Sequence, residues 1–387
     1  MMRKPIPYGR QDINDDDVKA VIDTLKSDYL TQVPKIKEFE EKFAAYVGAK
    51  YAVAVNNATS GLHLATTTLG VKPGDRIIVT PMTFAASANC VRYCGGEVTF
   101  CDIDPDTYLM DIEKLKEILA ANPRGTFKGV IVVDFAGYPH NLEQFRKVCD
   151  QYGLWLIEDA CHAPGAWFTD SEGNRQKSGN GKFADISVFS FHPVKHIATG
   201  EGGMVTTNNP ELYRRLAHFR THGITRDPVL LHKNDGGWYY EMQDLGFNYR
   251  LTDFQAALGV SQLARADKGL ARRQEIANRY DEAFKDIPSI KTPVRTIDIF
   301  HAFHLYIIQV PDRKSLYNWL HKNGILAQIH YVPLHLMPYY QERGNQKGDL
   351  PVVEKYYEHC ISLPMFPTLT NEEQKYVIDK VKEFILK

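Results

Sequence analysis

The chain has 387 residues, 44% of them hydrophobic and 24% charged, which is the composition of an ordinary globular protein long enough for about two domains. Its 46 Lys and Arg balance 47 Asp and Glu, so no excess of positive charge favours nucleic acid or an anionic membrane as a partner. The N-terminal segment lacks the apolar core of a signal peptide and no apolar run approaches the roughly 18 residues of a membrane span, so we expect a cytoplasmic protein.

The cysteines and histidines do not have the spacing of a metal site. The six cysteines include no C-x-x-C pair, and a chain of this length needs no disulfide framework. His218 and His222 have i, i+4 spacing but lack the Glu of the H-E-x-x-H motif. We therefore predict buried thiols and no metal.

Two helices are predicted near the N-terminus. The segment 12–25, DINDDDVKAVIDTL, has Asp residues at its start, where they suit the helix dipole. The segment 36–48, IKEFEEKFAAYVG, has amphipathic spacing and ends on glycine.

Short apolar runs that alternate with amphipathic segments follow. The apolar runs lie at 51–55, 76–80, 129–134, 154–159 and 186–191, and the amphipathic segments include 111–121 and 142–153. This alternation predicts an α/β fold with a mainly parallel sheet that is covered on both faces. In such sheets ligands bind beyond the carboxyl ends of the strands.

A second, smaller α/β domain is predicted for residues 246–387, after a large domain of residues 1–245. The polar segment 169–182 of the large domain predicts a surface hairpin or loop. The small domain is expected to contain helices after Thr252 and Asp253 within 246–264 and at 270–286, strands at 304–310 and 325–331, and a C-terminal helix with a T-x-x-E capping box from Thr370 to Glu373.

The strand at 51–55 leads into NNATSG, where small and hydroxyl side chains occupy the expected first turn of a helix. Free N–H groups there, with the hydroxyls of Thr59 and Ser60, form a candidate phosphate site. The alternative interpretation is an ordinary Ser/Thr helix cap. Neither a Walker motif nor G-x-G-x-x-G occurs, which disfavours a nucleoside triphosphate or NAD.

Acidic and aromatic side chains follow two other strands. The apolar run LWLI ends in Glu158 and Asp159, and a buried carboxylate at this point needs a cation. His162 is placed to support that carboxylate, and Phe84 follows the strand at 76–80, where it can stack on a flat ligand. Each also has a structural interpretation: a solvated strand end or ion pair for the acid, and core packing for the histidine and the phenylalanine.

One lysine, Lys195, stands in the segment FSFHPVKHIATGEGG, residues 189–203. A lysine amine forms a Schiff base with a carbonyl, and burial lowers its pKa enough to make it reactive. A Schiff-base lysine, an acid for a pyridinium nitrogen, a phosphate site and a stacking aromatic are the parts of a pyridoxal phosphate (PLP) site. Residue types alone leave open what the flanking His192 and His196 do.

Seven motifs together resemble the DegT/DnrJ/EryC1/StrS family of sugar aminotransferases, in the family's order and over almost the whole chain. They are YLTQVPKIKEFE, NNATSGLHLA, TPMTFAASAN, EDACHA, SFHPVKHIATGEGG, GFNYRLTDFQAALG and HYVPLH. The resemblance implies the type I aminotransferase fold, with a mainly parallel central sheet and a smaller C-terminal α/β domain. It also implies PLP as the cofactor.

The resemblance implies a role for each matching residue. Lys195 would bind the cofactor's aldehyde and move the proton, and Asp159 would pair with the ring nitrogen. The other cofactor contacts implied are Phe84 on the ring, His162 beside Asp159, Thr59, Ser60 and Ser190 on the phosphate, and Asn248, with Arg250, from a neighbouring subunit. A homodimer with its active sites at the interface is therefore implied.

The implied reaction transfers an amino group from L-glutamate, which leaves as 2-oxoglutarate, to a keto group of a nucleotide-linked sugar. Several segments most resemble the aminotransferases of pseudaminic acid biosynthesis, which aminate C4 of a UDP-linked 2-acetamido-2,6-dideoxy-hexos-4-ulose. Candidate substrate contacts are Thr31, Tyr239 or Tyr240, Arg250, His330 and Tyr331. The alternatives are an aminotransferase for another nucleotide-linked 3- or 4-keto sugar and a non-catalytic sensor of cofactor or sugar.

The chain departs from the family pattern at one position. The early motif usually reads T-Q-G, whereas this chain has Thr31, Gln32 and Val33. Because valine does not readily adopt positive φ, we expect a different path for the loop beside the sugar.

Overall fold

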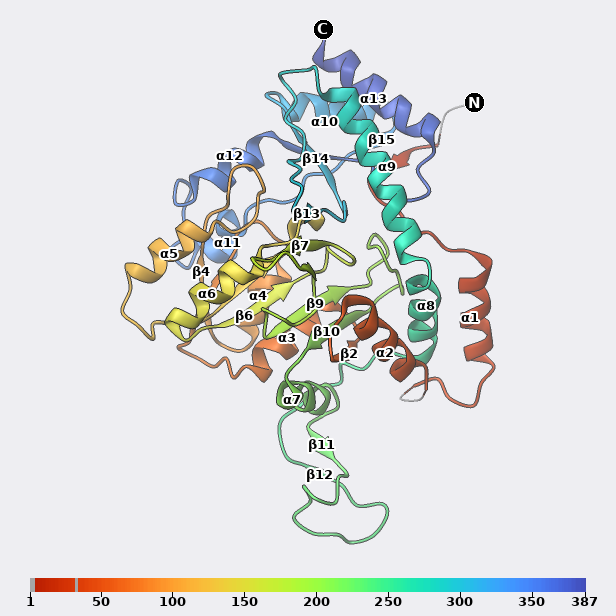
Figure 1. Ribbon diagram of the computed structural model, residues 1–387, viewed down its shortest axis with the longest axis vertical. Coiled ribbons are helices and arrows are strands. Elements are labelled where there is room, and N and C mark those ends of the chain that lie inside the picture. The colour runs from red at the N-terminus through yellow and green to blue at the C-terminus, as the bar shows by residue number, and fades with distance from the viewer. Residues whose placement is uncertain (1–3, 32–33) are drawn as a thin grey trace.

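The computed structural model describes residues 4–31 and 34–387. Its centre is a seven-stranded sheet in which β10 alone runs antiparallel to its neighbours (Figure 1). The strands, in order across the sheet, are β2 (Tyr51–Val55), β10 (Gly203–Thr207), β9 (Ile186–Ser190), β6 (Trp155–Asp159), β5 (Phe127–Val133), β3 (Arg76–Val79) and β4 (Glu97–Phe100).

Helices cover both faces of this sheet, as the near-continuous apolar strands require. One face packs against α3 (Ala58–Thr68), α4 (Ala86–Tyr93) and α7 (Pro210–Arg220). The other packs against α2 (Lys35–Val47), α5 (Ile112–Ala120) and α6 (Leu142–Tyr152). Successive strand residues point to opposite faces, so Val53 and Val55 join the first core whereas Ala52 and Ala54 join the second.

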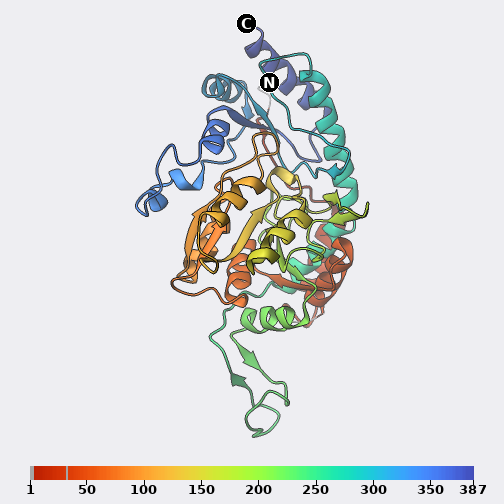
Figure 2. The ribbon, with the colours of Figure 1, turned by 60° about the vertical axis from the view of Figure 1, so that its left-hand side comes forward.

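Most of the C-terminal elements form a smaller layer beyond one end of the sheet, with the C-terminus near its tip (Figure 2). The long helix α9 (Ala266–Phe284) leads into it, and β14 (Tyr306–Gln309) pairs there with β16 (Cys360–Leu363). Also present are α10 (Arg313–Lys322), α11 (Pro338–Gln341), α12 (Pro351–His359) and α13 (Asn371–Ile385). The predicted capping box is confirmed, since the side chain of Thr370 and that of Glu373 each accept from the other's backbone amide.

The N-terminal segment contacts both parts of the chain. Strand β1 (Ile6–Pro7) pairs in parallel with β15 (Ile325–Leu326), whereas α1 (Asp15–Leu25) packs against α8 (Asp253–Leu263). The division of the chain between residues 245 and 246 stays a prediction.

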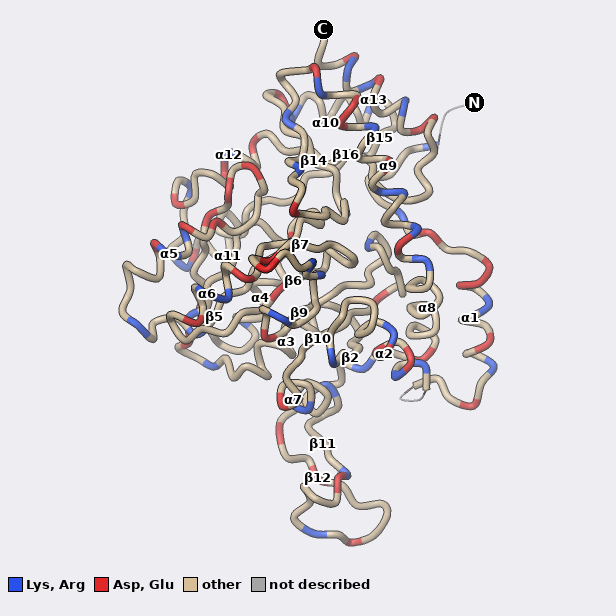
Figure 3. The backbone as a smooth tube through the Cα atoms, viewed as in Figure 1, with Lys and Arg blue, Asp and Glu red and all other residues tan. Residues whose placement is uncertain are grey.

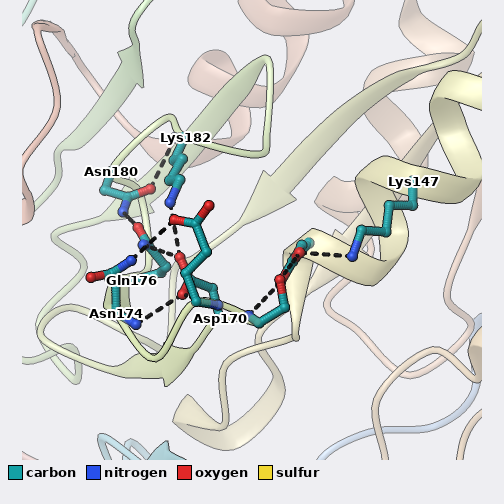
Figure 4. Close-up of polar contacts among 9 residues, drawn as sticks. Lys147, Asp170, Asn174, Gln176, Asn180 and Lys182 are labelled. Carbon is teal, nitrogen blue, oxygen red and sulfur yellow. Dashed lines mark hydrogen bonds and ion pairs between the residues drawn. The ribbon is translucent and has the colours of Figure 1, made fainter.

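The polar segment at 169–182 contains a hairpin, as predicted. Strands β7 (Trp167–Thr169) and β8 (Arg175–Lys177) pair antiparallel, and β13 (Ile299–Phe300) extends them. The carboxylate of Asp170 holds the turn, since it accepts from Gln176 Nε2 at 2.6 Å and Lys182 Nζ at 2.8 Å (Figure 4). Ser171 of the same turn donates to the carboxylate of Glu143 on α6, so this cluster joins the hairpin to a neighbouring helix and is structural.

The strands differ from the sequence prediction in several places, and β4 and β16 are among those that were not predicted. The strand expected at 325–331 spans only Ile325–Leu326, because the chain then leaves the sheet edge and His330 Nδ1 contacts the Ser362 hydroxyl at 2.8 Å. Strand β10 was not predicted, because its sequence GMVTT carries polar residues in a fully buried strand.

An arm projects from the body between α7 and residue 246 (Figures 1 and 2). It contains β11 (Ile224–Thr225) and β12 (Glu241–Met242), which pair antiparallel. Several of its apolar side chains lie in solvent, with Val229 89% exposed and Trp238 73% exposed. Elsewhere on the surface, Lys and Arg are interspersed with Asp and Glu, for example along α1 and α13 (Figure 3).

Candidate active site

A cavity of about 700 Å³ lies beyond the carboxyl ends of β5, β6 and β9. This is the edge at which parallel sheets bind ligands. Of the residues predicted from the sequence, those that line it are Thr59, Ser60, Phe84, Asp159, His162, Ser190, Lys195, His330 and Tyr331.

Asp159 is the last residue of β6 and its carboxylate is buried. It accepts a hydrogen bond from Ser87 Oγ at 2.7 Å and one from the amide of Cys161 at 3.2 Å. Among the residues that the structure describes, no cationic side chain forms an ion pair with it. A buried carboxylate in this state favours a cationic ligand.

Lys195 follows β9 in a turn in which its amide donates to the carbonyl of His192 at 2.9 Å. Desolvation lowers the pKa of its amine to about 8, although Cys161 and Asp159 oppose that shift. Its Nζ lies 3.4 Å from Nε2 of His304. A larger share of neutral, nucleophilic amine is therefore present near neutral pH than for an exposed lysine.

The phosphate candidates surround the first turn of α3. Asn57 caps this helix by accepting from the amide of Ser60 at 2.8 Å, and Thr59 lies beside it. Ser190 ends β9, where Gly203 of β10 pairs with it. A Cβ at Gly203 would lie 2.8 Å from the amide nitrogen of Ala58, so the start of α3 packs directly on the sheet backbone. The helix N-terminus thus faces the cavity and attracts an anion.

Aromatic residues form the wall opposite. Phe84 is 63% exposed at the cavity, so the alternative interpretation of this residue as core does not hold. Its ring centroid lies 6.4 Å from that of Tyr331, whose hydroxyl is 3.4 Å from Nε2 of His162. Burial raises the pKa of the Tyr331 hydroxyl, which is therefore a neutral donor.

His162 is buried beside Asp159 in sequence, yet its hydrogen bonds go elsewhere. The amide of Ala136 donates to its Nδ1 at 3.2 Å, which places the ring proton on Nε2, next to Tyr331. Burial holds the pKa of His162 well below its usual value, so the ring is neutral. The expected hydrogen bond to Asp159 is not among those of the described residues.

Five candidate residues do not line this cavity: Thr31, Tyr239, its alternative Tyr240, Asn248 and Arg250. Thr31 forms an isolated β-bridge with Thr252, and Asn248 forms one with Thr221. Arg250 lies two residues after Asn248, shortly before the start of α8. Tyr239 lies in the arm, where its hydroxyl donates to Glu241 at 2.8 Å. Gln32 and Val33 lie outside the described residues, so the expected change in the loop path is untested.

The sequence analysis missed several residues of the cavity wall. Ser87 lies in the TFAASAN motif, three residues after Phe84, and this short spacing is a signal that could have indicated a shared site. Tyr8 and His304 carry no such local signal. Both come from segments far from the motifs in sequence, and only the packing of the smaller layer brings them to the cavity.

Comparison with known proteins identifies the chemistry of this site. The model of the DegT/DnrJ/EryC1/StrS aminotransferase family matches residues 11–382. The chain belongs to this family. It is 36% identical over 381 residues to the UDP-4-amino-4,6-dideoxy-N-acetyl-beta-L-altrosamine transaminase of Campylobacter jejuni, covering 97% of this chain and 96% of that protein.

Solved structures agree with this assignment. Helicobacter pylori PseC, an aminotransferase of pseudaminic acid biosynthesis, superposes with a TM-score of 0.90 at 32% identity, over 99% of this chain and 100% of the other. Spr1654 of Streptococcus pneumoniae, in its PMP form, gives a TM-score of 0.89 at 31% identity over 98% of both chains. The protein is thus a PLP-dependent sugar aminotransferase, and the predicted fold class, family and cofactor are confirmed.

The residues present fit PLP. The cavity is lined by the N-terminus of α3, which attracts anions, by the buried carboxylate of Asp159 and by the Lys195 amine of lowered pKa. No described helix has the length and apolar character needed to cross a membrane. Within residues 4–31 and 34–387, no group of three or more His, Cys, Asp and Glu side chains is arranged to hold a metal ion.

Proposed function

We propose that this DegT-family enzyme transfers the amino group of L-glutamate to the C4 keto group of a UDP-linked 2-acetamido-2,6-dideoxy-hexos-4-ulose, as a cytoplasmic step of pseudaminic acid biosynthesis. The observation that carries the proposal is the convergence of Lys195, Asp159, His330 and Tyr331 on one cavity. Its similarity to the altrosamine transaminase and to PseC supports the choice of sugar.

The cofactor-facing residues have the following proposed roles. When bound, PLP supplies an aldehyde that condenses with amines and a pyridinium ring that withdraws electrons. The buried carboxylate of Asp159 keeps a proton on the ring nitrogen, because a cation there relieves the cost of burying the charge. Phe84 would pack against the ring, and the first turn of α3 would hold the phosphate with Thr59, Ser60 and Ser190.

Lys195 is the proposed acid and base of both half-reactions. Its amine, with a pKa of about 8, would accept a proton from one reacting carbon and donate it to the other, the two carbons being those bonded to the transferred nitrogen. A base with a pKa near the working pH is efficient in both directions, because neither protonation state is scarce. His162 positions the hydroxyl of Tyr331 from the opposite wall.

His330 and Tyr331 are the proposed sugar contacts. Burial lowers the pKa of His330 to about 3, so its imidazole is neutral, and the hydroxyl of Ser362 contacts its Nδ1 at 2.8 Å. The ring of Tyr8 packs beside His330 with centroids 5.1 Å apart. Neutral polar edges and aromatic faces are suited to sugar hydroxyl groups and C–H faces.

The working unit is proposed to be a homodimer. Asn248 and Arg250 lie at the base of the exposed arm and outside their own chain's cavity, which is consistent with a contact to the partner's phosphate site. Thr31 and Tyr239 are likewise proposed to contact substrate across the interface. The exposed apolar side chains of the arm are the expected interface surface.

The test of the substrate is an amination assay of purified enzyme with glutamate and a panel of UDP- and dTDP-linked keto sugars. We expect the enzyme to turn over the isomer of this UDP-linked 4-keto sugar that has the L-arabino configuration. The Lys195→Ala control should show no turnover. Loss of the yellow colour on adding glutamate checks the donor separately. Good turnover of the D-xylo isomer with none of the L-arabino compound would refute the substrate while leaving the aminotransferase assignment intact.

A further inference from the structure

The amine of Lys195 has a contact that the sequence did not predict. Its Nζ lies 3.4 Å from Nε2 of His304, a residue 109 positions along the chain and only 4% exposed. His304 lies just before β14 in the smaller layer, whereas Lys195 follows β9 of the large sheet. The two parts of the fold therefore meet at the reactive nitrogen.

The backbone that presents His304 is tightly held. Nη1 of the buried Arg273, on α9, donates to the carbonyls of Phe303 at 3.0 Å, His304 at 3.3 Å and Met365 at 3.0 Å. Phe303 has a φ of 49°, and its amide donates to Nδ1 of His301 at 2.9 Å. A non-glycine residue keeps positive φ only where its surroundings impose it. The position of His304 is thus set by several independent contacts.

The imidazole itself is confined on the other side. Its ring centroid lies 4.3 Å from that of His162 and 5.7 Å from that of His196. Its Nδ1 is buried and makes no hydrogen bond to any residue that the structure describes. Among the described residues, Lys195 is therefore the only polar partner of the ring. Without it, both ring nitrogens would be buried with no hydrogen-bond partner, which is costly.

The groups that face the amine are mainly neutral or positive. They are Asp159, Cys161, His162, His196, His304, His330 and Arg273. Burial and the charge of Lys195 hold the pKa of His304 well below its usual value, so the ring stays neutral. A neutral imidazole can accept from the ammonium form of Lys195 or, in its other tautomer, donate to the amine form.

We propose that His304 is a positioning residue for Lys195, holding Nζ at the cavity in both protonation states whenever the amine is not joined to the cofactor. The amine must stay within reach while it waits to move a proton or to recapture the cofactor. A hydrogen bond to a rigid ring achieves this, since a free lysine side chain has many rotamers to lose. Arg273 acts one step further back by fixing the backbone of His304.

The test separates covalent capture of the cofactor from non-covalent binding. Apoenzyme is mixed with PLP, whose aldehyde condenses with the lysine amine and releases water, and the visible band gives the capture rate. Pyridoxamine phosphate (PMP) has no aldehyde, so its Kd reports the binding site without Lys195 chemistry. His304→Leu has no polar group at position 304, and the amide of His304→Asn is too short to contact Nζ of Lys195. His304→Gln restores a polar group that can reach Nζ.

We expect the Leu and Asn variants to capture PLP about tenfold more slowly, the effect of one lost hydrogen bond, with the Kd for PMP changed less than about twofold. His304→Gln recovers most of the rate. The matched control, His335→Gln, changes another buried histidine, whose ring contacts Glu354 and neither Lys195 nor the backbone of His304, and leaves the rate near that of the parent.

Either of two results overturns the proposal: an unchanged capture rate in His304→Asn, or a parallel loss of PLP capture and PMP affinity that His304→Gln does not reverse. The second result would assign His304 a purely structural role. No sugar enters the experiment, so it stands or falls independently of the proposed substrate.

Discussion

Asp159 is held at the cavity by two neutral hydrogen-bond donors, and no cationic side chain of the described residues forms an ion pair with it. The Ser87 hydroxyl and the Cys161 amide satisfy its oxygens without neutralising the carboxylate. A hydroxyl and an amide orient a carboxylate, but a cation is needed to offset the cost of its burial. The residue is therefore more suited to a charged ligand than to the stability of the empty fold.

Replacing Asp159 tests this directly. We expect Asp159→Asn to lower kcat/KM at least about a hundredfold, because the ring nitrogen loses the anion that keeps it protonated. The apoenzyme of the variant should melt at the parent temperature or above it, since a buried charge has been removed. Steady-state kinetics and thermal melts of apoenzyme measure the two effects. A variant with parental activity would show that Asp159 does not touch the cofactor.

At the residue scale, the sequence predicted the cavity residues that lie directly after strands. Phe84 and Asp159 follow from the rule that parallel strands present ligand contacts at their carboxyl ends, whereas Ser190 was implied by the family resemblance. Tyr8 and His304 could not be predicted in this way, because they reach the cavity through long-range packing. The hydrogen-bond partners of His162 were also beyond the sequence, since Ala136 and Tyr331 are distant in the chain.

At the scale of elements, a buried carboxyl pair joins the ends of β5 and β6. Asp134 accepts from the Ser178 hydroxyl at 2.6 Å, and Glu158 accepts from the Ser187 hydroxyl at 2.6 Å. Burial raises the pKa of Asp134 to about 6, and burial together with the Asp134 charge raises that of Glu158 well above its usual value. The pair therefore retains protons that both carboxyls lose in the unfolded chain.

This pair predicts a pH dependence of stability. Between the usual carboxyl pKa, about 4, and the raised values, the folded chain binds more protons than the unfolded one, so stability falls as pH rises. The glutamine of Glu158→Gln cannot ionise. From pH 5 to 8, the fall in melting temperature should therefore be smaller for this variant than for the parent, by about 2 °C or more. The exposed Glu117→Gln serves as control. Identical pH profiles for Glu158→Gln and the parent would contradict the prediction.

The contact between β10 and α3 gives a second prediction at this scale. A Cβ at Gly203 would meet the backbone of Asn57 and Ala58 at 2.8 Å, so Gly203→Ala must displace the first turn of α3. We expect about 1–3 kcal/mol lower stability and a weaker affinity for PMP, because the phosphate site moves with the turn. Titration of apoenzyme with PMP, beside thermal melts, measures both. Gly237→Ala is the control, because this glycine has open space around it and does not have positive φ. Unchanged PMP affinity in Gly203→Ala would argue against a phosphate site at α3.

Most elements of the large sheet were predictable because burial on both faces leaves near-continuous apolar runs. Strand β10 was not, because Thr206 and Thr207 are buried polar residues whose hydroxyls donate to the carbonyls of Gly179 and Asp185. The short strand β15 was overestimated for a related reason: after Leu326, Ala327 and Ile329 pack in the hydrophobic core, whereas His330 and Tyr331 line the cavity. The local sequence pattern does not distinguish the residues of a strand from residues that line a cavity.

At the scale of the whole molecule, the arm is the feature that a single chain does not explain. It extends away from the body in both views (Figures 1 and 2) and exposes apolar side chains instead of folding them onto α7. Its strands contain two residues each, too few to be stable alone. An exposed apolar segment of this kind marks an interaction surface, and the proposed partner is a second copy of the chain.

The dimer is testable through the arm. We expect the 44.1 kDa chain to migrate at twice its mass in size exclusion with light scattering. Trp238 and Leu245 are 73% and 81% exposed in the single chain. Their joint replacement by Asp should shift micromolar protein to the monomer. Each apolar side chain that no longer becomes buried at the interface weakens association by about 1–3 kcal/mol. Ile297→Asp, at a position 93% exposed outside the arm, should leave the dimer intact. If Asn248 completes the partner's phosphate site, the monomeric variant also binds PMP more weakly than the parent. A parent that is monomeric, or a double variant that stays dimeric with unchanged PMP affinity, would place the function of the arm elsewhere.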